Sequence, residues 1–120
     1  MGGSECLFCD ILNNKKSAQR ILETDDFIVI ENKYPKAPIH LLVVDKTHRE
    51  KSDTMAGAYQ NESYWDKLFQ AVHEAVVKLN LDKMGYKVVI NESKYYHYGH
   101  EHVHVVGGGL GEVDSGEIRL

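Results

Sequence analysis

The chain has 120 residues, a hydrophobic fraction of 42% and a formal net charge of −4, from 14 basic and 18 acidic side chains. This length predicts one domain around one core, and the acidic balance argues against a general nucleic-acid binder. No apolar stretch is long enough to cross a bilayer, the start lacks signal-peptide features, and two cysteines do not resemble a secreted disulfide framework. We therefore expect a cytoplasmic protein without a membrane partner.

The first half of the chain predicts a short helix followed by three strands. Apolar residues with helical spacing indicate a helix over 7–12. Two short apolar segments, 20–24 and 27–31, flank an Asp-Asp pair and predict a hairpin. After a proline-containing loop, the run 39–45 is the strongest strand, although it carries one polar residue, His40, in an apolar stretch.

The second half predicts one long helix between strands. A short helix is expected within 47–53, and apolar residues at 3–4 spacing predict an amphipathic helix over 62–80. Two more strands are predicted over 85–90 and 102–106. This order predicts an α+β fold with an approximately five-stranded, mostly antiparallel sheet, one long helix and one or two short helices.

The chain ends and one basic run lie outside this pattern. We expect a single domain over 1–120, in which residues 1–5 are flexible or derived from cloning and residues 111–120 form a C-terminal tail. The basic run is interpreted as a solvated face, with steering of a phosphate ester as the alternative. Its members are Lys46, His48, Arg49 and Lys51.

Three histidines alternate along the last predicted strand. His100, His102 and His104 should project from one face, while the residues between them take the other. Imidazole acts as ligand, base or nucleophile near neutral pH. The alternative is a metal-scavenging histidine tract, but the strand spacing favours a built site.

The two cysteines, Cys6 and Cys9, have the spacing of one half of a tetrahedral zinc site. A pair alone is incomplete, so two alternatives stay open: free buried thiols and a redox-active pair. The redox alternative lacks a preceding strand of the kind that a thioredoxin-like unit needs.

Five segments resemble, in order, motifs of the histidine triad (HIT) family. The family pattern His-x-His-x-His followed by two apolar residues matches 100–106. Residues 7–11 resemble the opening helix, 37–44 the strand that carries a further histidine, 45–48 the segment after it, and 86–92 the strand that leads to an asparagine. Two glycines after the triad resemble the Hint-like nucleoside phosphoramidase branch more than the dinucleoside polyphosphate hydrolases.

The resemblance implies nucleotidyl transfer through a covalent intermediate. It makes His102 the nucleophile at an α-phosphorus, with His104 and His40 as donors and Asn91 as a neutral donor. For His40 alone, the alternative is a core histidine with a satisfied hydrogen bond. The resemblance to zinc-containing relatives also points to His48 and His100 as the ligands that complete a structural zinc site.

The resemblance further implies a nucleotide site, with two departures. Asn32 stands where the family has a ribose-binding acid, and Tyr95-Tyr96-His97-Tyr98-Gly99 stands where the family has Gly-Gln-Ser/Thr before the triad. Gly99 would still allow the backbone to approach a phosphate closely. Candidates for an apolar slot that receives the base are Phe8, Ile11 and Ile28.

We therefore expect a homodimeric, zinc-containing hydrolase or transferase that cleaves nucleoside 5′-phosphoramidates, or related purine nucleotide conjugates, through a nucleotidyl-His102 intermediate. The alternatives are a zinc-containing nucleotide-binding protein of the same fold with little turnover, and a dinucleoside polyphosphate hydrolase. The enzymatic hypothesis requires that the His102 ring faces an open cleft with His40 nearby.

Overall fold

The computed structural model describes residues 6–92 and 95–108. The predicted flexible start over 1–5 and the predicted tail over 111–120 lie outside the described residues. In chain order the elements are α1 (Leu7–Leu12), β1 (Arg20–Glu23), β2 (Phe27–Glu31), β3 (Ile39–Asp45), α2 (Lys51–Met55), the 3-10 helix η2 (Gln60–Glu62), α3 (Tyr64–Lys78), α4 (Leu81–Met84), β4 (Tyr86–Val89) and β5 (His102–Gly107). Within the described ranges, no helix combines the length and apolarity needed to span a bilayer.

The five strands form one sheet in the order β1-β2-β3-β5-β4, and every neighbouring pair is antiparallel. The predicted α+β class and antiparallel sheet are confirmed. The structure differs in two respects: α3 is shorter at both ends than the predicted helix over 62–80, and two short helices that were not predicted, η2 and α4, flank it. Asn80 adopts a left-handed backbone with φ 58°, a conformation that asparagine tolerates better than most residues, and the chain turns there from α3 into α4.

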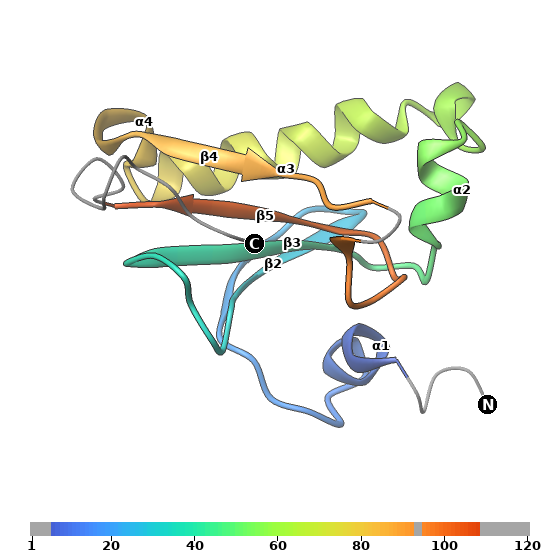
Figure 1. Cartoon of the computed structure of the whole chain (residues 1–120), viewed down its shortest axis with the longest axis horizontal. Coiled ribbons are helices and arrows are strands. Elements are labelled where there is room, and N and C mark those ends of the chain that lie inside the picture. Colours follow the sequence, from blue (N-terminus) through green and yellow to red (C-terminus); the bar gives the residue numbers. More distant parts are fainter. Residues whose placement is uncertain (1–5, 93–94, 109–120) are drawn as a thin grey trace.

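The sheet separates two apolar clusters. In Figure 1, α3 lies along one face of the sheet and α1 lies under the other. Because side chains alternate along a strand, odd-numbered residues of β2, β3 and β5 pack under α3, and even-numbered residues of β2 and β3 pack against α1. The α3 cluster includes Phe27, Val29, Leu41, Val43, Leu68, Ala71, Val103 and Val105, and the α1 cluster includes Phe8, Ile11, Ile28, Ile30, Leu42 and Val44.

The pairing of β3 with β5 brings the histidines together. Leu42 pairs with His104 and Val44 pairs with His102, so these histidines share the α1 face with His40. His100 precedes β5 and forms an isolated bridge with Glu50. The two central strands therefore present imidazoles on the face opposite the α3 core.

Candidate active site and metal site

His40 and His104 form a directly hydrogen-bonded pair across β3 and β5. His40 Nε2 lies 2.9 Å from His104 Nδ1, and the Lys36 backbone N–H donates to His40 Nδ1 at 3.0 Å. Because His40 Nδ1 accepts, its proton sits on Nε2 and is donated to His104 Nδ1. His104 in turn carries its proton on Nε2, which makes that nitrogen a hydrogen-bond donor.

The central histidine, His102, has its tautomer fixed in the opposite sense. Its Nδ1 lies 2.8 Å from the carbonyl oxygen of His100, to which it donates. The lone pair is therefore on Nε2. Burial is the main cause that lowers the pKa of His102 to about 3, and the nearby Lys51 ammonium lowers it further. Near neutral pH the ring is an uncharged imidazole with a free lone pair.

The same environment keeps the neighbouring imidazoles neutral. Burial, followed by the charge of His40, lowers the pKa of His104 to about 4. Burial and Lys36 lower the pKa of His40. The His102 and His104 rings lie 5.5 Å apart between centroids, so a nucleophilic nitrogen and a donor ring are neighbours.

The open cleft required over His102 is not what the structure shows. The residue is only 4% exposed, because the ring of Phe8 lies 4.8 Å away and the ring of Tyr98 lies 6.5 Å away, centroid to centroid. His40 is near, as expected, and it is also 4% exposed. His104 is half-buried. The requirement for an open cleft is therefore not met in this conformation, and the enzymatic hypothesis needs Phe8 and Tyr98 to move aside before a phosphate can reach His102.

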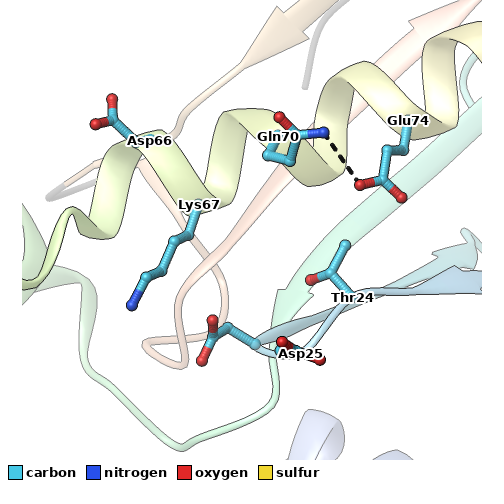
Figure 2. A pocket seen from close by; sticks show the side chains of 7 residues that line it. Thr24, Asp25, Asp66, Lys67, Gln70 and Glu74 are labelled. Atoms are coloured by element: carbon cyan, nitrogen blue, oxygen red, sulfur yellow. Dashed lines mark hydrogen bonds between the residues drawn. The ribbon is translucent and has the colours of Figure 1, made fainter.

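A separate surface cavity of about 500 Å³ lies between the β1–β2 turn and α3 (Figure 2). Four carboxylates and one ammonium line it, and this balance opposes binding of a phosphate. The charged lining residues are Asp25, Asp26, Asp66, Glu74 and Lys67. This cavity therefore does not supply the nucleotide site.

Of the predicted substrate-binding residues, Asn32 lies beside the histidine pair, whereas the predicted apolar slot is packed into the core. Asn32 Nδ2 lies 3.2 Å from His40 Nε2, beside the histidine pair. Asn91 lies two residues beyond Val89, which pairs with His104. The predicted apolar slot is filled, because its residues pack into the α1 cluster. Exposed fractions there are 2% for Phe8, 7% for Ile11 and 1% for Ile28.

Gly99 has a visible structural task. A Cβ at this position would clash with the Glu50 carboxylate, which in turn is hydrogen-bonded to His48 Nε2. The absence of a side chain at Gly99 thus lets the segment before the triad lie against the loop that carries His48. The predicted close approach of Gly99 to a phosphate stays a prediction.

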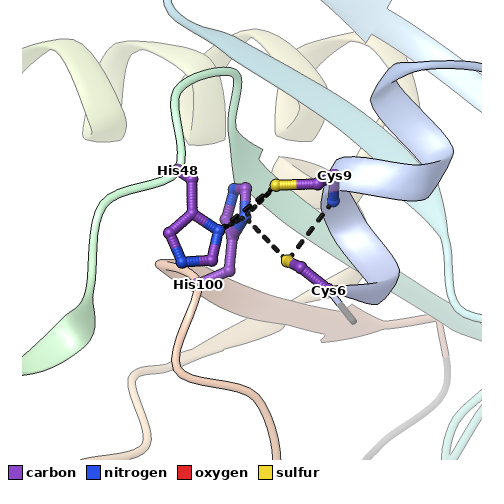
Figure 3. Close-up of side chains that lie close together, drawn as sticks. All are labelled: Cys6, Cys9, His48 and His100. Atoms are coloured by element: carbon purple, nitrogen blue, oxygen red, sulfur yellow. Dashed lines mark hydrogen bonds between the residues drawn. The ribbon is translucent and has the colours of Figure 1, made fainter. Parts of the chain in front are cut away.

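The four predicted metal ligands come together from three distant parts of the chain (Figure 3). One donor atom from each of Cys6, Cys9, His48 and His100 lies within 4.8 Å of the others. Separations include 3.3 Å from Cys6 Sγ to His100 Nδ1 and 3.2 Å from Cys9 Sγ to His48 Nδ1. Two sulfur and two nitrogen donors at these spacings fit a tetrahedral zinc ion.

Hydrogen bonds behind the ligands orient the two imidazoles. His100 Nε2 donates to the Asp45 carbonyl oxygen at 2.7 Å, and His48 Nε2 donates to the Glu50 carboxylate. Both Nδ1 lone pairs therefore point into the cluster. Burial and the adjacent Cys6 thiol raise the pKa of Cys9 to about 11, and coordination to a cation favours the thiolate instead.

Sequence reasoning missed a buried polar group beneath the triad. Glu101 and Lys51 are both 0% exposed, and Lys51 Nζ lies 2.6 Å from Glu101 Oε1. The interpretation of the basic run as a solvated face is wrong for Lys51, and Arg49 is paired with the buried Asp45 at 3.1 Å. One signal was available: a glutamate that alternates with valines takes a core position, and a buried carboxylate needs a cationic partner.

Comparisons with known proteins agree with this geometry. The family model described as "Scavenger mRNA decapping enzyme C-term binding" matches residues 5–111. A HIT-like protein of Chlamydia muridarum is 33% identical over 112 residues, which cover 91% of this chain and 86% of that protein. The chain therefore belongs to the histidine triad (HIT) family.

Solved structures show the same fold. A histidine triad protein from Clostridium difficile superposes with a TM-score of 0.77 at 23% identity, over 87% of this chain and 90% of that chain. A Zn-bound histidine triad family protein from Mycobacterium smegmatis superposes with a TM-score of 0.66 at 30% identity, over 88% and 76% of the two chains. The predicted HIT-like fold is thereby confirmed.

Proposed function

We propose that this protein is a nucleotidyl hydrolase that cleaves nucleoside 5′-phosphoramidates, or related nucleotide conjugates, through a covalent nucleotidyl-His102 intermediate. The observation that carries the proposal is the hydrogen bond from His102 Nδ1 to the His100 carbonyl. It leaves the Nε2 lone pair free, and the low pKa of the ring keeps that lone pair unprotonated at neutral pH.

The reaction divides into two displacements at phosphorus. In the first, His102 Nε2 forms a bond to the α-phosphorus, and the bond from phosphorus to the leaving nitrogen breaks as that nitrogen takes a proton from solvent, to which the attacking water returns a proton in the second. In the second, water attacks the phosphorus, releases the nucleoside monophosphate and restores the neutral ring. We assign His104, His40 and Asn91 to stabilise the charge that develops on the phosphoryl oxygens.

A His102→Asn variant tests the intermediate. We expect turnover of an AMP–amine conjugate to fall on the order of 10⁴-fold, because the nucleophile is lost, while nucleotide binding persists. Mass spectrometry should detect one AMP moiety on the wild-type chain after a quench in neutral denaturant, since a phosphorus–imidazole bond is acid-labile. The matched control is His73→Asn, at an exposed position of α3. An adduct that persists in His102→Asn contradicts the proposal.

A second candidate function is nucleotide binding with little turnover. The 4% exposure of His102 favours it, together with the tyrosine-rich segment that replaces the family's Gly-Gln-Ser/Thr. A third is hydrolysis of dinucleoside polyphosphates. A substrate panel that contains an AMP–amine conjugate and a dinucleoside polyphosphate separates the three, because the binding protein yields no monophosphate from either.

We also propose a purine nucleotide ligand, a homodimer and a cytoplasmic setting for the single domain. Support for the dimer is that β4 forms an edge of the sheet and exposes Tyr86 at 44%.

For the metal, the Zn-bound relative from Mycobacterium smegmatis supports zinc in the Cys6, Cys9, His48 and His100 cluster. All four ligand positions come from the chain, so its role is structural.

A further inference from the structure

The backbone N–H and carbonyl of His102 lie in a part of β5 that pairs with β3 on one side and has no β4 pairing on the other. On one side of β5, the Glu101 carbonyl accepts the Asp45 N–H of β3 at 3.1 Å. The next N–H, that of His102, points the other way, toward the β4 side. There the pairing of β4 ends at Val89, opposite His104. His102 therefore lies two residues beyond the last pair of the β4–β5 ladder.

Side chains take the place of the missing strand. Glu101 Oε1 accepts the His102 N–H at 2.9 Å, and Lys51 Nζ donates to the His102 carbonyl at 2.7 Å. The same ammonium lies 2.6 Å from Glu101 Oε1. A donor and an acceptor thus face the nucleophile's backbone as the peptide groups of a neighbouring strand would.

The helix α2 fixes this group from the outside. Thr54 Oγ1 donates to Glu101 Oε2 at 2.6 Å, so both carboxylate oxygens are bonded. The Lys51 N–H donates to the Gly99 carbonyl at 2.8 Å, and the Glu101 N–H donates to the Arg49 carbonyl at 2.7 Å. The start of α2 and the segment before β5 are therefore held together by backbone bonds on either side of the ion pair.

We propose that Lys51, Glu101 and Thr54 are positioning residues, which hold the His102 backbone where β4 does not reach and thereby aim its ring at the phosphorus. They touch no substrate and act through His102. The inference has two halves. The backbone half, that these side chains hold the His102 peptide groups, is independent of the proposed function, whereas the catalytic half, that they thereby aim the ring at phosphorus, rests on it.

The choice of variant follows from burial. Removal of one partner alone leaves a buried charge unpaired and destabilises strongly, whereas removal of both removes the charges together. The Glu92 carboxylate, 4.0 Å from Lys51 Nζ, remains beside the site in the double variant. The test is therefore the double variant Lys51→Met/Glu101→Leu. Its matched control is Lys46→Met/Glu23→Leu, which removes an exposed ion pair with a 2.8 Å contact elsewhere on the sheet.

Two readouts are measured on the full chain. The His102 amide should exchange its hydrogen about tenfold faster in the double variant than in the control, the effect of one lost hydrogen bond, while the Val103 and Val105 amides stay protected. With an AMP–amine conjugate, kcat should fall about 10- to 100-fold with KM unchanged, as expected for a misplaced nucleophile.

A milder pair of variants keeps the test decisive if the double variant does not fold. Thr54→Val removes the hydroxyl that bonds Glu101, and Thr54→Ser retains it. We expect kcat to fall several-fold in the valine variant and to be native in the serine variant, with KM unchanged in both.

Opposite outcomes would overturn the inference. Unchanged exchange at the His102 amide in the double variant would refute the backbone half, and unchanged kcat despite faster exchange would refute the catalytic half. Absence of turnover in the wild type refutes the proposed function instead, and the exchange measurement then still decides the backbone half.

Discussion

Each imidazole of the triad face has a role assigned by its hydrogen-bond partner. The Lys36 N–H and the His100 carbonyl are backbone groups, and they set the tautomers of His40 and His102 in opposite senses. Identical side chains thus present a hydrogen-bond donor at His40 Nε2 and a free lone pair at His102 Nε2, the nitrogen that the proposed reaction uses as nucleophile. Burial then keeps them uncharged, because an imidazolium ion is poorly solvated in this environment.

That burial predicts a pH dependence of stability. The pKa of His104 is about 4 in the folded protein, against an ordinary value of 6.5. Between these values the unfolded chain binds a proton that the folded chain does not bind, so the free energy of unfolding decreases as pH falls from 6.5 to 4. Urea unfolding of His104→Gln should show a shallower decrease over this interval.

The control for that measurement is His73→Gln, at an exposed position of α3. Because both variants keep every metal ligand, their difference isolates the histidine pair. An equal slope in His104→Gln and the wild type would contradict the assigned pKa.

At the scale of elements, β3 and β5 show why much of the site could be predicted from sequence. Period-two alternation places His102 and His104 on one face of β5. Whether His40 shares that face depends on the register of β3 with β5, in which Leu42 pairs with His104, and the sequence did not predict this register. Alternation cannot say what lies above that face. The cover on His102 arises because α1 packs Phe8 against it, a contact between residues 94 positions apart in the sequence.

The same limit explains the misinterpreted lysine. Lys51 looks like a member of a solvated basic run until α2 is docked onto Glu101, and only then does its ammonium have a buried partner. Local patterns predict elements well, and they predict tertiary ion pairs poorly because partners come from distant segments. The metal site was predicted in two steps: the spacing of Cys6 and Cys9 indicated half of it, and the resemblance to zinc-containing relatives supplied His48 and His100.

The segment before β5 supplies a prediction at this scale. Tyr98 contacts the ring of Phe8 at 5.4 Å between centroids and lies 6.5 Å from His102. Tyr98→Ala should therefore raise the exposure of His102 and accelerate its modification by diethylpyrocarbonate several-fold, measured by peptide mass spectrometry. Tyr95→Ala is the matched control, since Tyr95 is 76% exposed. An unchanged rate in Tyr98→Ala would show that Phe8 alone limits access.

At the scale of the molecule, the Cys/His cluster joins the start of the described chain to its last strand. The ligands are Cys6 at the N-terminal cap of α1, Cys9 within α1, His48 in the loop after β3, and His100, two residues before β5. α1 contacts the sheet through the smaller apolar cluster and through the ring of Phe8 on His102, whereas α3 packs on the larger apolar cluster. The position of α1 therefore depends strongly on the Cys/His cluster.

Removal of the metal tests this dependence. Protein purified without a histidine tag should contain about one equivalent of zinc, and a chelator should lower Tm. With free zinc about 1,000-fold above Kd, the lost stabilisation is about 4 kcal/mol. Cys6→Ser/Cys9→Ser should contain no zinc and show no further change in Tm with chelator. Full zinc content in that double variant would contradict the assigned ligands.

The hydrogen bond from His102 Nδ1 to the His100 carbonyl links the metal site to the triad, and this affects how an inhibition experiment is interpreted. The ligand imidazole of His100 and the carbonyl that orients the nucleophile belong to one residue. If the proposed function holds, a chelator that frees His100 would also displace the carbonyl that orients His102, and activity would fall even though the proposed role of the ion is structural. Dependence of activity on zinc would therefore indicate a structural role of the ion. An unchanged rate after zinc is exchanged for a different divalent ion would support that role.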